Sequence, residues 1–354
     1  MIPLAKPDLS GNELKYVTDC IQSGWISKGK YITKFEDMFS KFMGGGHSTT
    51  VCNGTVALHL ALETLGIKEG DEVIVPDLTY IASANAVSYT GAKVVLCDVE
   101  KDSWCMCPKD MESKITKRTK AIMPVHLYGR TANMFEICKI AKKYNLFVIE
   151  DCAEALGASI YDIKVGNFSD ISCFSFFGNK IISTGEGGMC FTKNKKLDAK
   201  MKHLRNHAIV SQGVDGYTHD CIGYNYRMTN VQAAIGLAQM ERIKYFLKER
   251  DKIDKWYRIC FDMSWKPKGY INWLFTYVNS FYNIKKLTKY LQTKGIESRP
   301  VFTQLSKMEP YKKIKGGFKN SAFISQFGIT LPTWVGMTEK DVKQIVETIE
   351  GCEE

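Results

Sequence analysis

The sequence predicts an α/β protein with two parts, a large domain built on a mostly parallel sheet and a smaller α+β domain after it. Short apolar runs alternate with helix-like stretches over most of the chain, and this alternation gives way to a helix-dominated pattern after about residue 240. With 354 residues, the chain is also long enough for a large domain and a second, smaller one.

Several apolar runs in the first part of the chain are typical of buried strands. They comprise residues 72–76, 93–98, 121–125, 146–151 and 171–176. Helix-like stretches lie between most of them, such as residues 55–65, closed by Gly66, and residues 134–144. This alternation predicts a sheet that is covered by helices on both faces. Ligands bind beyond the carboxyl ends of the strands in such sheets, so we expect the functional residues where the strands end.

The C-terminal part opens with a long charged helix, predicted over residues 241–257. A strand-like run at residues 273–278 and helices at residues 283–294 and 338–349 follow it. We therefore predict a large domain over residues 1–240 and a small α+β domain over residues 241–354.

Composition and charge narrow the classes of function. No apolar run has the length of a membrane helix, and the first 15 residues lack the apolar core of a signal peptide, so we expect a cytoplasmic protein without a membrane partner. The formal net charge is +10, and residues 241–354 hold 21 Lys or Arg against 13 Asp or Glu. These cations form no dense run, which favours a solvated surface and no nucleic-acid partner.

The twelve cysteines are scattered, and Cys97, Cys173 and Cys190 lie in strand-like runs. Reduced thiols in the core are the better interpretation of this distribution. Cys105 and Cys107 form a C-x-C pair without further cysteines or histidines at metal-ligand spacing, so we expect no metal site.

The tripeptide Asn53-Gly54-Thr55 directly precedes an apolar helix-like stretch. Free N–H groups and the helix dipole make such a helix start suitable for binding a phosphate, with Gly54 allowing close approach and Thr55 adding a hydroxyl. An ordinary N-cap would explain the same three residues.

Asp151 closes the apolar run 146–151, where a buried carboxylate is costly without a partner. A pyridinium nitrogen is one such partner, and pairing with it keeps an aromatic cofactor ring able to accept electrons. A helix cap at Asp151 is the structural alternative, and Glu150 could equally be the exposed member of the two neighbouring acids.

Lys180 follows the strand-like run 171–176 and precedes the glycine-rich stretch 185–188. Its neighbours are apolar or small, which favours a partly desolvated amine that forms a Schiff base with an aldehyde. Most lysines taken singly are surface residues, and this environment sets Lys180 apart from them.

Together these motifs resemble the sugar aminotransferases called the DegT/DnrJ/EryC1/StrS family, which are fold-type I pyridoxal-phosphate enzymes. The resemblance covers nearly the whole chain and is closest to perosamine synthase-like 4-aminotransferases. The matching segments are residues 2–7, 23–27, 52–55, 76–80, 150–154, 174–188 and 223–228. It implies an aspartate-aminotransferase-like fold, in which the large domain carries a mostly parallel seven-stranded sheet.

The resemblance also implies a role for each matching residue. Lys180 is the catalytic residue, which carries pyridoxal 5'-phosphate covalently and, once released, moves the proton. The other cofactor-binding residues are Gly54, Thr55 and Ser175 at the phosphate, Asp151 at the ring nitrogen, Tyr80 against the ring, Glu154 near the ring hydroxyl or the sugar, and Asn225 from a second subunit. Without the resemblance, Tyr80 would be interpreted as a core tyrosine and Asn225 as a turn residue.

The implied reaction moves an amino group from L-glutamate to C4 of a nucleotide-linked 4-keto-6-deoxyhexose, in a homodimer with shared active sites. Related sugar dehydratases carry histidine in place of Lys180, so the lysine favours an aminotransferase. The alternatives are a 3-aminotransferase of a nucleotide-linked 3-keto sugar, an amino-acid aminotransferase with Arg299 as carboxylate clamp, and a non-catalytic cofactor-binding regulator.

Overall fold

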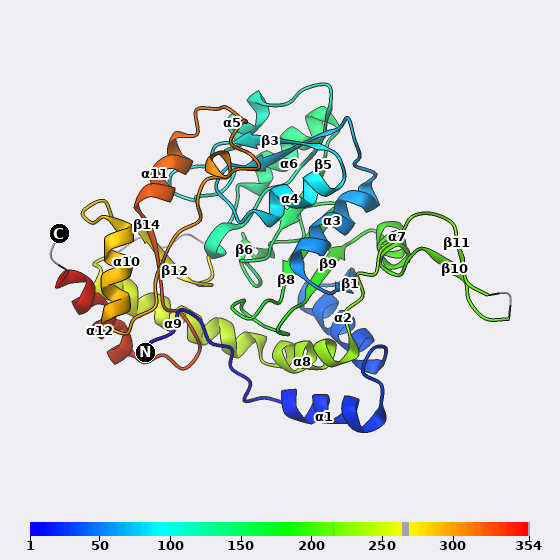
Figure 1. Cartoon of the computed structure of the whole chain (residues 1–354), viewed down its shortest axis with the longest axis horizontal. Coiled ribbons are helices and arrows are strands. Elements are labelled where there is room, and N and C mark those ends of the chain that lie inside the picture. Colours follow the sequence, from blue (N-terminus) through cyan, green and yellow to red (C-terminus); the bar gives the residue numbers. More distant parts are fainter. Residues whose placement is uncertain (215, 264–268, 353–354) are drawn as a thin grey trace.

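The computed structural model describes residues 1–214, 216–263 and 269–352. A seven-stranded sheet lies at its centre, surrounded by helices (Figure 1). The strand order is β1 (His47–Val51), β9 (Gly188–Thr192), β8 (Ile171–Ser175), β5 (Phe147–Asp151), β4 (Thr119–Ile122), β2 (Glu72–Pro76) and β3 (Lys93–Cys97). β9 runs antiparallel to both of its neighbours, β1 and β8, and the pairs from β8 to β3 are parallel. The predicted α/β fold with a mostly parallel sheet is confirmed.

Helices pack on both faces of the sheet, because alternate residues of each strand point to opposite sides. Ile74 of β2 belongs to one hydrophobic core, and Val73 and Val75 belong to the other. The first core includes residues of α2 (Lys30–Phe42), α5 (Pro108–Ser113), α6 (Met134–Tyr144) and α8 (Asn230–Glu241), and the second includes residues of α3 (Gly54–Leu65), α4 (Ala82–Tyr89) and α7 (Lys195–Arg205). The buried thiols Cys97, Cys173 and Cys190 are free, as predicted.

The C-terminal part forms a second, smaller sheet of three antiparallel strands. Its order is β12 (Phe275–Val278), β14 (Gly328–Leu331) and β13 (Arg299–Pro300). The helices α9 (Ile243–Cys260), α10 (Ile284–Thr293), α11 (Lys319–Phe327) and α12 (Glu339–Glu350) accompany it. The predicted single helix from residue 241 is wrong at its start, because α8 ends at Glu241 and α9 begins at Ile243.

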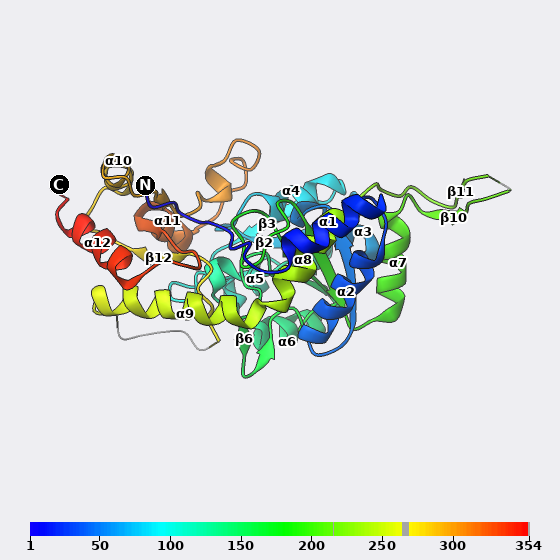
Figure 2. The same ribbon diagram turned by 90° about the horizontal axis from the view of Figure 1, so that it is seen from below.

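Two segments cross the predicted domain boundary near residue 240. The N-terminal residues lie beside α10 and α12 in both views (Figures 1 and 2), and Ile2 pairs with Ile296. In the opposite direction, the side chain of Gln304 and the backbone N–H of Ser306 donate hydrogen bonds of 2.8 Å to the buried carboxylate of Asp77, just beyond β2. The boundary remains a prediction, and these contacts connect the two parts, in the case of Asp77 directly after the end of β2.

The remaining elements belong to neither of these two sheets. They are α1 (Glu13–Ser23), short 3₁₀ turns at Leu127–Gly129 and Leu305–Lys307, the hairpin of β6 (Ser159–Ile160) and β7 (Ile163–Lys164), and the hairpin of β10 (Ile209–Ser211) and β11 (Thr218–His219). The β10–β11 hairpin projects away from the body of the molecule (Figure 2). Among the described residues, no helix combines the length and the apolar character that a bilayer span requires.

Gly129 packs against Ile271 of the C-terminal part, so a substitution there tests the packing between the two parts. Its φ is 79°, and a Cβ atom added there would overlap the carbonyl oxygen of Ile271. We expect Gly129→Ala to lower the free energy of unfolding by about 2–4 kcal/mol, through the left-handed backbone and the clash. Gly70→Ala is the matched control, because Gly70 has φ 90° with nothing within 4 Å of the added Cβ. Denaturant unfolding should show the smaller loss for Gly70→Ala, and equal losses would contradict the clash.

Candidate active site

The predicted site residues gather at the carboxyl ends of three parallel strands. Asp151 is the last residue of β5, Ser175 is the last residue of β8, and Tyr80 lies in the loop after β2. Lys180 lies in the turn that connects β8 to β9. This is the edge of the sheet at which α/β folds bind their ligands.

Lys180 is held in a mostly buried position. Its backbone N–H donates to the carbonyl oxygen of Phe177 at 2.9 Å, which closes the turn. The side chain is only 13% exposed, and its Nζ lies 3.3 Å from Oε1 of Glu154. The same Nζ lies 3.9 Å from the ring centroid of Trp273. The amine is therefore fixed between a carboxylate and an aromatic face, as a lysine with a chemical role requires.

Asp151 is buried and accepts two hydrogen bonds. Ser83 Oγ donates to one carboxylate oxygen at 2.8 Å, and the backbone N–H of Ala153 donates to the other at 3.1 Å. Burial raises the pKa of Asp151, while these hydrogen bonds and the charge of Lys180 oppose the increase. Asp151 forms no ion pair with another residue in the described part of the chain, so the carboxylate can pair with a cationic ligand.

Glu154 faces the lysine from the loop after β5. It is buried, and the backbone N–H of Tyr128 donates to its Oε2 at 2.9 Å. Burial raises the pKa of Glu154, and the charge of Lys180 acts against that change. The charge of Lys180 lowers the pKa of both Asp151 and Glu154, so the amine and the two acids form one group of neighbouring side chains.

Gly54, Thr55 and Ser175, called the cradle below, lie where the start of α3 meets the end of β8. A Cβ atom added at Gly54 would lie 2.8 Å from the Cβ of Ser175, so the helix start and the strand end are in close contact. Asn53 caps α3 by accepting the N–H of Val56 at 3.0 Å. The N-cap does not exclude a phosphate site, because the backbone N–H groups of Gly54 and Thr55 have no acceptor within the helix.

Tyr80 and Asn225 lie at the surface of the single chain. The side chain of Tyr80 is 57% exposed, with its ring 5.6 Å from that of Phe302, so the interpretation as a core tyrosine is wrong. Asn225 is exposed in a segment that pairs with Asn206. Its predicted reach into a second subunit remains a prediction.

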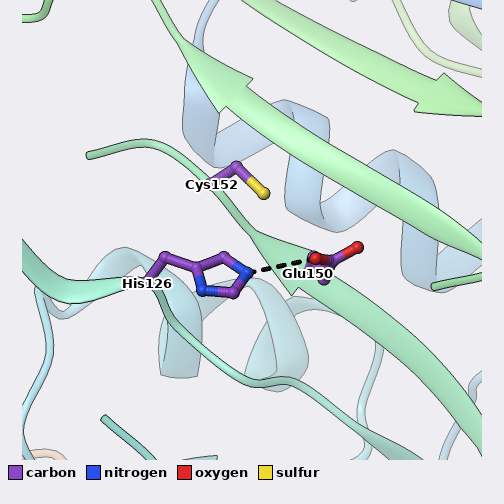
Figure 3. A group of neighbouring side chains, drawn as sticks. All are labelled: His126, Glu150 and Cys152. Carbon is purple, nitrogen blue, oxygen red and sulfur yellow. Dashed lines mark hydrogen bonds and ion pairs between the residues drawn. The ribbon is translucent and has the colours of Figure 1, made fainter. Parts of the chain in front are cut away.

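Glu150 is not the exposed member of its pair. It is fully buried, and it accepts hydrogen bonds from His126, Ser169 and the N–H groups of Gly166 and Phe168. His126, Glu150 and Cys152 form a compact group whose potential ligand atoms lie within 4.8 Å of one another (Figure 3). The backbone N–H of Ala132 occupies the other ring nitrogen of His126. These hydrogen bonds identify a structural network that fixes the strand bearing Asp151.

Arg299 does not have the geometry of a buried carboxylate clamp. Its side chain is 64% exposed and pairs with Glu297 at 2.9 Å. The observation disfavours the amino-acid aminotransferase that the sequence left open.

Sequence reasoning missed Ser83, Tyr128 and Trp273. Ser83 reaches Asp151 from α4, while Tyr128 and Trp273 surround the pair formed by Lys180 and Glu154. Each of these residues is distant in sequence from its partner, and no local pattern marks it.

Comparison with known proteins shows the family of this chain. The sequence profile of the DegT/DnrJ/EryC1/StrS aminotransferase family matches residues 7–350. The chain belongs to this family. GDP-perosamine synthase of Escherichia coli O157:H7 is 45% identical to it, with 98% of this chain and 97% of the relative covered. GDP-perosamine synthase of Vibrio cholerae is 41% identical, with 99% of both chains covered.

A solved structure agrees with the family assignment. The PLP-form of the putative sugar aminotransferase Spr1654 from Streptococcus pneumoniae superimposes with a TM-score of 0.91 at 26% identity, covering 98% of this chain and 97% of that one. The chain is thus a pyridoxal-phosphate-dependent sugar aminotransferase with the predicted fold.

The site residues fit pyridoxal phosphate. Asp151 supplies a buried carboxylate for a ring nitrogen, Lys180 supplies the amine, and the cradle at Gly54, Thr55 and Ser175 supplies N–H and hydroxyl donors for a phosphate. The individual contacts remain predictions.

Gly54 allows a direct test of the cradle. We expect Gly54→Ala to weaken cofactor binding by about 10- to 100-fold, because the added methyl group forces Ser175 or the helix start to move and disrupts one or two charge-assisted hydrogen bonds. Titration of the apoprotein with pyridoxal phosphate, followed by absorbance, measures this change. Gly178→Ala is the control, because nothing lies within 4 Å of the Cβ added there. Unchanged affinity in Gly54→Ala would place the phosphate elsewhere.

Proposed function

We propose that this aminotransferase takes the amino group of L-glutamate and transfers it to the C4 ketone of a nucleotide-linked 4-keto-6-deoxyhexose, with GDP as the nucleotide. The observation that carries the proposal is the full-length similarity to two GDP-perosamine synthases at 41% and 45% identity. The expected product is the corresponding GDP-linked 4-amino-4,6-dideoxyhexose.

The pocket has the groups that such a transfer needs. Bound pyridoxal phosphate supplies the aldehyde that accepts an amino group and the ring that withdraws electrons from the reacting carbon. The released amine of Lys180 takes a proton from one carbon and returns it to another in this proposal. Asp151 holds a proton on its ring partner, and Glu154 keeps the lysine oriented at 3.3 Å.

We further propose a cytoplasmic homodimer with shared active sites. The exposed position of Asn225 and the projecting β10–β11 hairpin support an arrangement in which a second copy completes each pocket (Figure 2). A subunit-mixing experiment tests this arrangement. Inactive Lys180→Ala and Asn225→Ala chains should regain part of the activity when they are mixed, because some mixed dimers hold one intact site.

A panel of acceptors tests the substrate. GDP-, UDP- and dTDP-linked 4-keto-6-deoxyhexoses and a UDP-linked 3-keto sugar are incubated with the enzyme and L-glutamate, and the products are identified by mass and by NMR assignment of the aminated carbon. We expect the GDP-linked 4-keto sugar to give the highest kcat/KM. Preferred amination of the 3-keto sugar would establish the 3-aminotransferase instead, and turnover of keto acids alone would refute the sugar substrate.

A further inference from the structure

Trp273 contacts the catalytic lysine from the C-terminal part of the chain. It lies two residues before β12, and its side chain is buried, with 2% of the residue exposed. The face of the indole lies over Nζ of Lys180 at 3.9 Å. The indole N–H donates to the carbonyl oxygen of Asn179 at 2.7 Å, so Trp273 holds both the amine and the backbone directly before it.

The position of Trp273 is fixed from several directions. The ring of Tyr128 stacks on the indole with centroids 5.5 Å apart and an interplanar angle of 21°. On the backbone side, the buried guanidinium of Arg250 donates to the carbonyl oxygens of Trp273 and Thr333. A ring that is restrained by stacking, by its own N–H and by its backbone cannot easily turn away from Lys180.

The two partners of the lysine amine are also coupled to each other. Tyr128 donates its backbone N–H to Glu154 at 2.9 Å and stacks its ring on Trp273. One residue therefore supports the carboxylate on one side of the amine and the indole on the other side.

We propose that Trp273 is a positioning residue for Lys180, which holds the free amine in place whenever it is not bonded to the cofactor. A lysine side chain has four rotatable carbon–carbon bonds, and confining it near its target raises its effective concentration there. The indole face also favours the protonated amine at this place, which helps Lys180 to accept a proton. The proposal rests on the family assignment and does not depend on which sugar is the substrate.

Two variants and a matched control separate this role from general packing. Trp273→Leu removes the aromatic face and the N–H donor, whereas Trp273→Phe keeps an aromatic face and removes the donor together with part of the ring. Trp104→Leu is the control, because Trp104 is also buried and contacts Tyr128, but its face lies over Arg130 at 3.8 Å. Thermal unfolding of each apoprotein measures the loss of packing.

Two rates are then measured on the apoproteins without any sugar. One is the rate of covalent cofactor attachment, followed by visible absorbance after mixing with pyridoxal phosphate. The other is the rate at which a small acylating reagent modifies Lys180, followed by mass spectrometry of its peptide. For Trp273→Leu we expect attachment to slow by roughly 3- to 30-fold, because the amine is no longer confined near its target. Acylation should become faster, because the cover over the amine is lost.

Slower cofactor attachment together with faster acylation would indicate a positioning role, because an unstable fold alone would not slow attachment while it accelerates acylation. In the loaded enzyme, kcat should fall within the same range, while KM for both substrates changes by less than about threefold. Trp273→Phe should attach the cofactor within about threefold of the wild-type rate. Equal attachment rates in Trp273→Leu and Trp104→Leu would overturn the proposal. Equal loss in Trp273→Phe and Trp273→Leu would also overturn it, because the ring face would then contribute nothing.

Discussion

Lys180→Ala should abolish sugar amination, with kcat/KM reduced by at least about 10⁴-fold. The expected loss is large because one amine performs two tasks, the covalent attachment of the cofactor and the proton transfer. The variant should also fail to develop the visible absorbance of covalently held pyridoxal phosphate. Single-turnover assays with product detection by mass measure the residual rate.

Two controls separate amine chemistry from charge and from packing. Lys180→Arg keeps a cation next to Glu154 but cannot attach the cofactor, so it should be as inactive as Lys180→Ala. Lys139→Ala removes a surface lysine that pairs with Glu136 at 3.4 Å, and it should retain full activity. Activity within tenfold of wild type in Lys180→Ala would show that another residue carries the cofactor.

The sequence predicted those strands that consist of strong apolar runs. It did not predict a strand whose buried side chains are polar. All five runs that we assigned as strands contain strands: the run 72–76 matches β2 at both ends, and the other four differ by one to three residues at one or both ends. The strand β1 was missed because its buried residues include Ser48, Thr49 and Thr50. These hydroxyls are satisfied by distant partners, such as Asp198 for Thr49 and Glu36 for Thr50, so the strand shows no apolar pattern.

The predicted site residues differ from the missed ones in how clearly they stand out from their local sequence. Lys180 and Asp151 were found because each breaks an apolar context in its own segment, where an ionisable group is costly. Trp273 and Tyr128 are aromatic residues in apolar surroundings, which local patterns cannot distinguish from ordinary core residues. Only the fold brings them to the lysine, across 93 residues in the case of Trp273 and Lys180.

Asp151→Asn should lower kcat/KM by about 10²- to 10³-fold, the cost of removing one member of a buried ion pair. The amide preserves the shape of the side chain, and it can accept from Ala153 through Oδ1 and donate to Ser83 Oγ through Nδ2, so the packing should change little. What the variant loses is the negative charge that keeps a proton on the cofactor ring. Steady-state kinetics with L-glutamate and the keto sugar measure the loss.

The same substitution should stabilise the apoprotein at neutral pH, in the opposite direction to its effect on activity. Because burial raises the pKa of Asp151 above its unfolded value, the folded state holds this proton more tightly than the unfolded state does. Wild-type stability is therefore lost as pH rises through the folded pKa, and Asp151→Asn avoids this loss. Its advantage in unfolding temperature should be largest near pH 7 and should disappear below about pH 4, where the aspartate is protonated in both states. An apoprotein that is destabilised at pH 7 by Asp151→Asn would show that the carboxylate already has a cationic partner within the chain, and the pairing with a ring nitrogen would lose its physical basis.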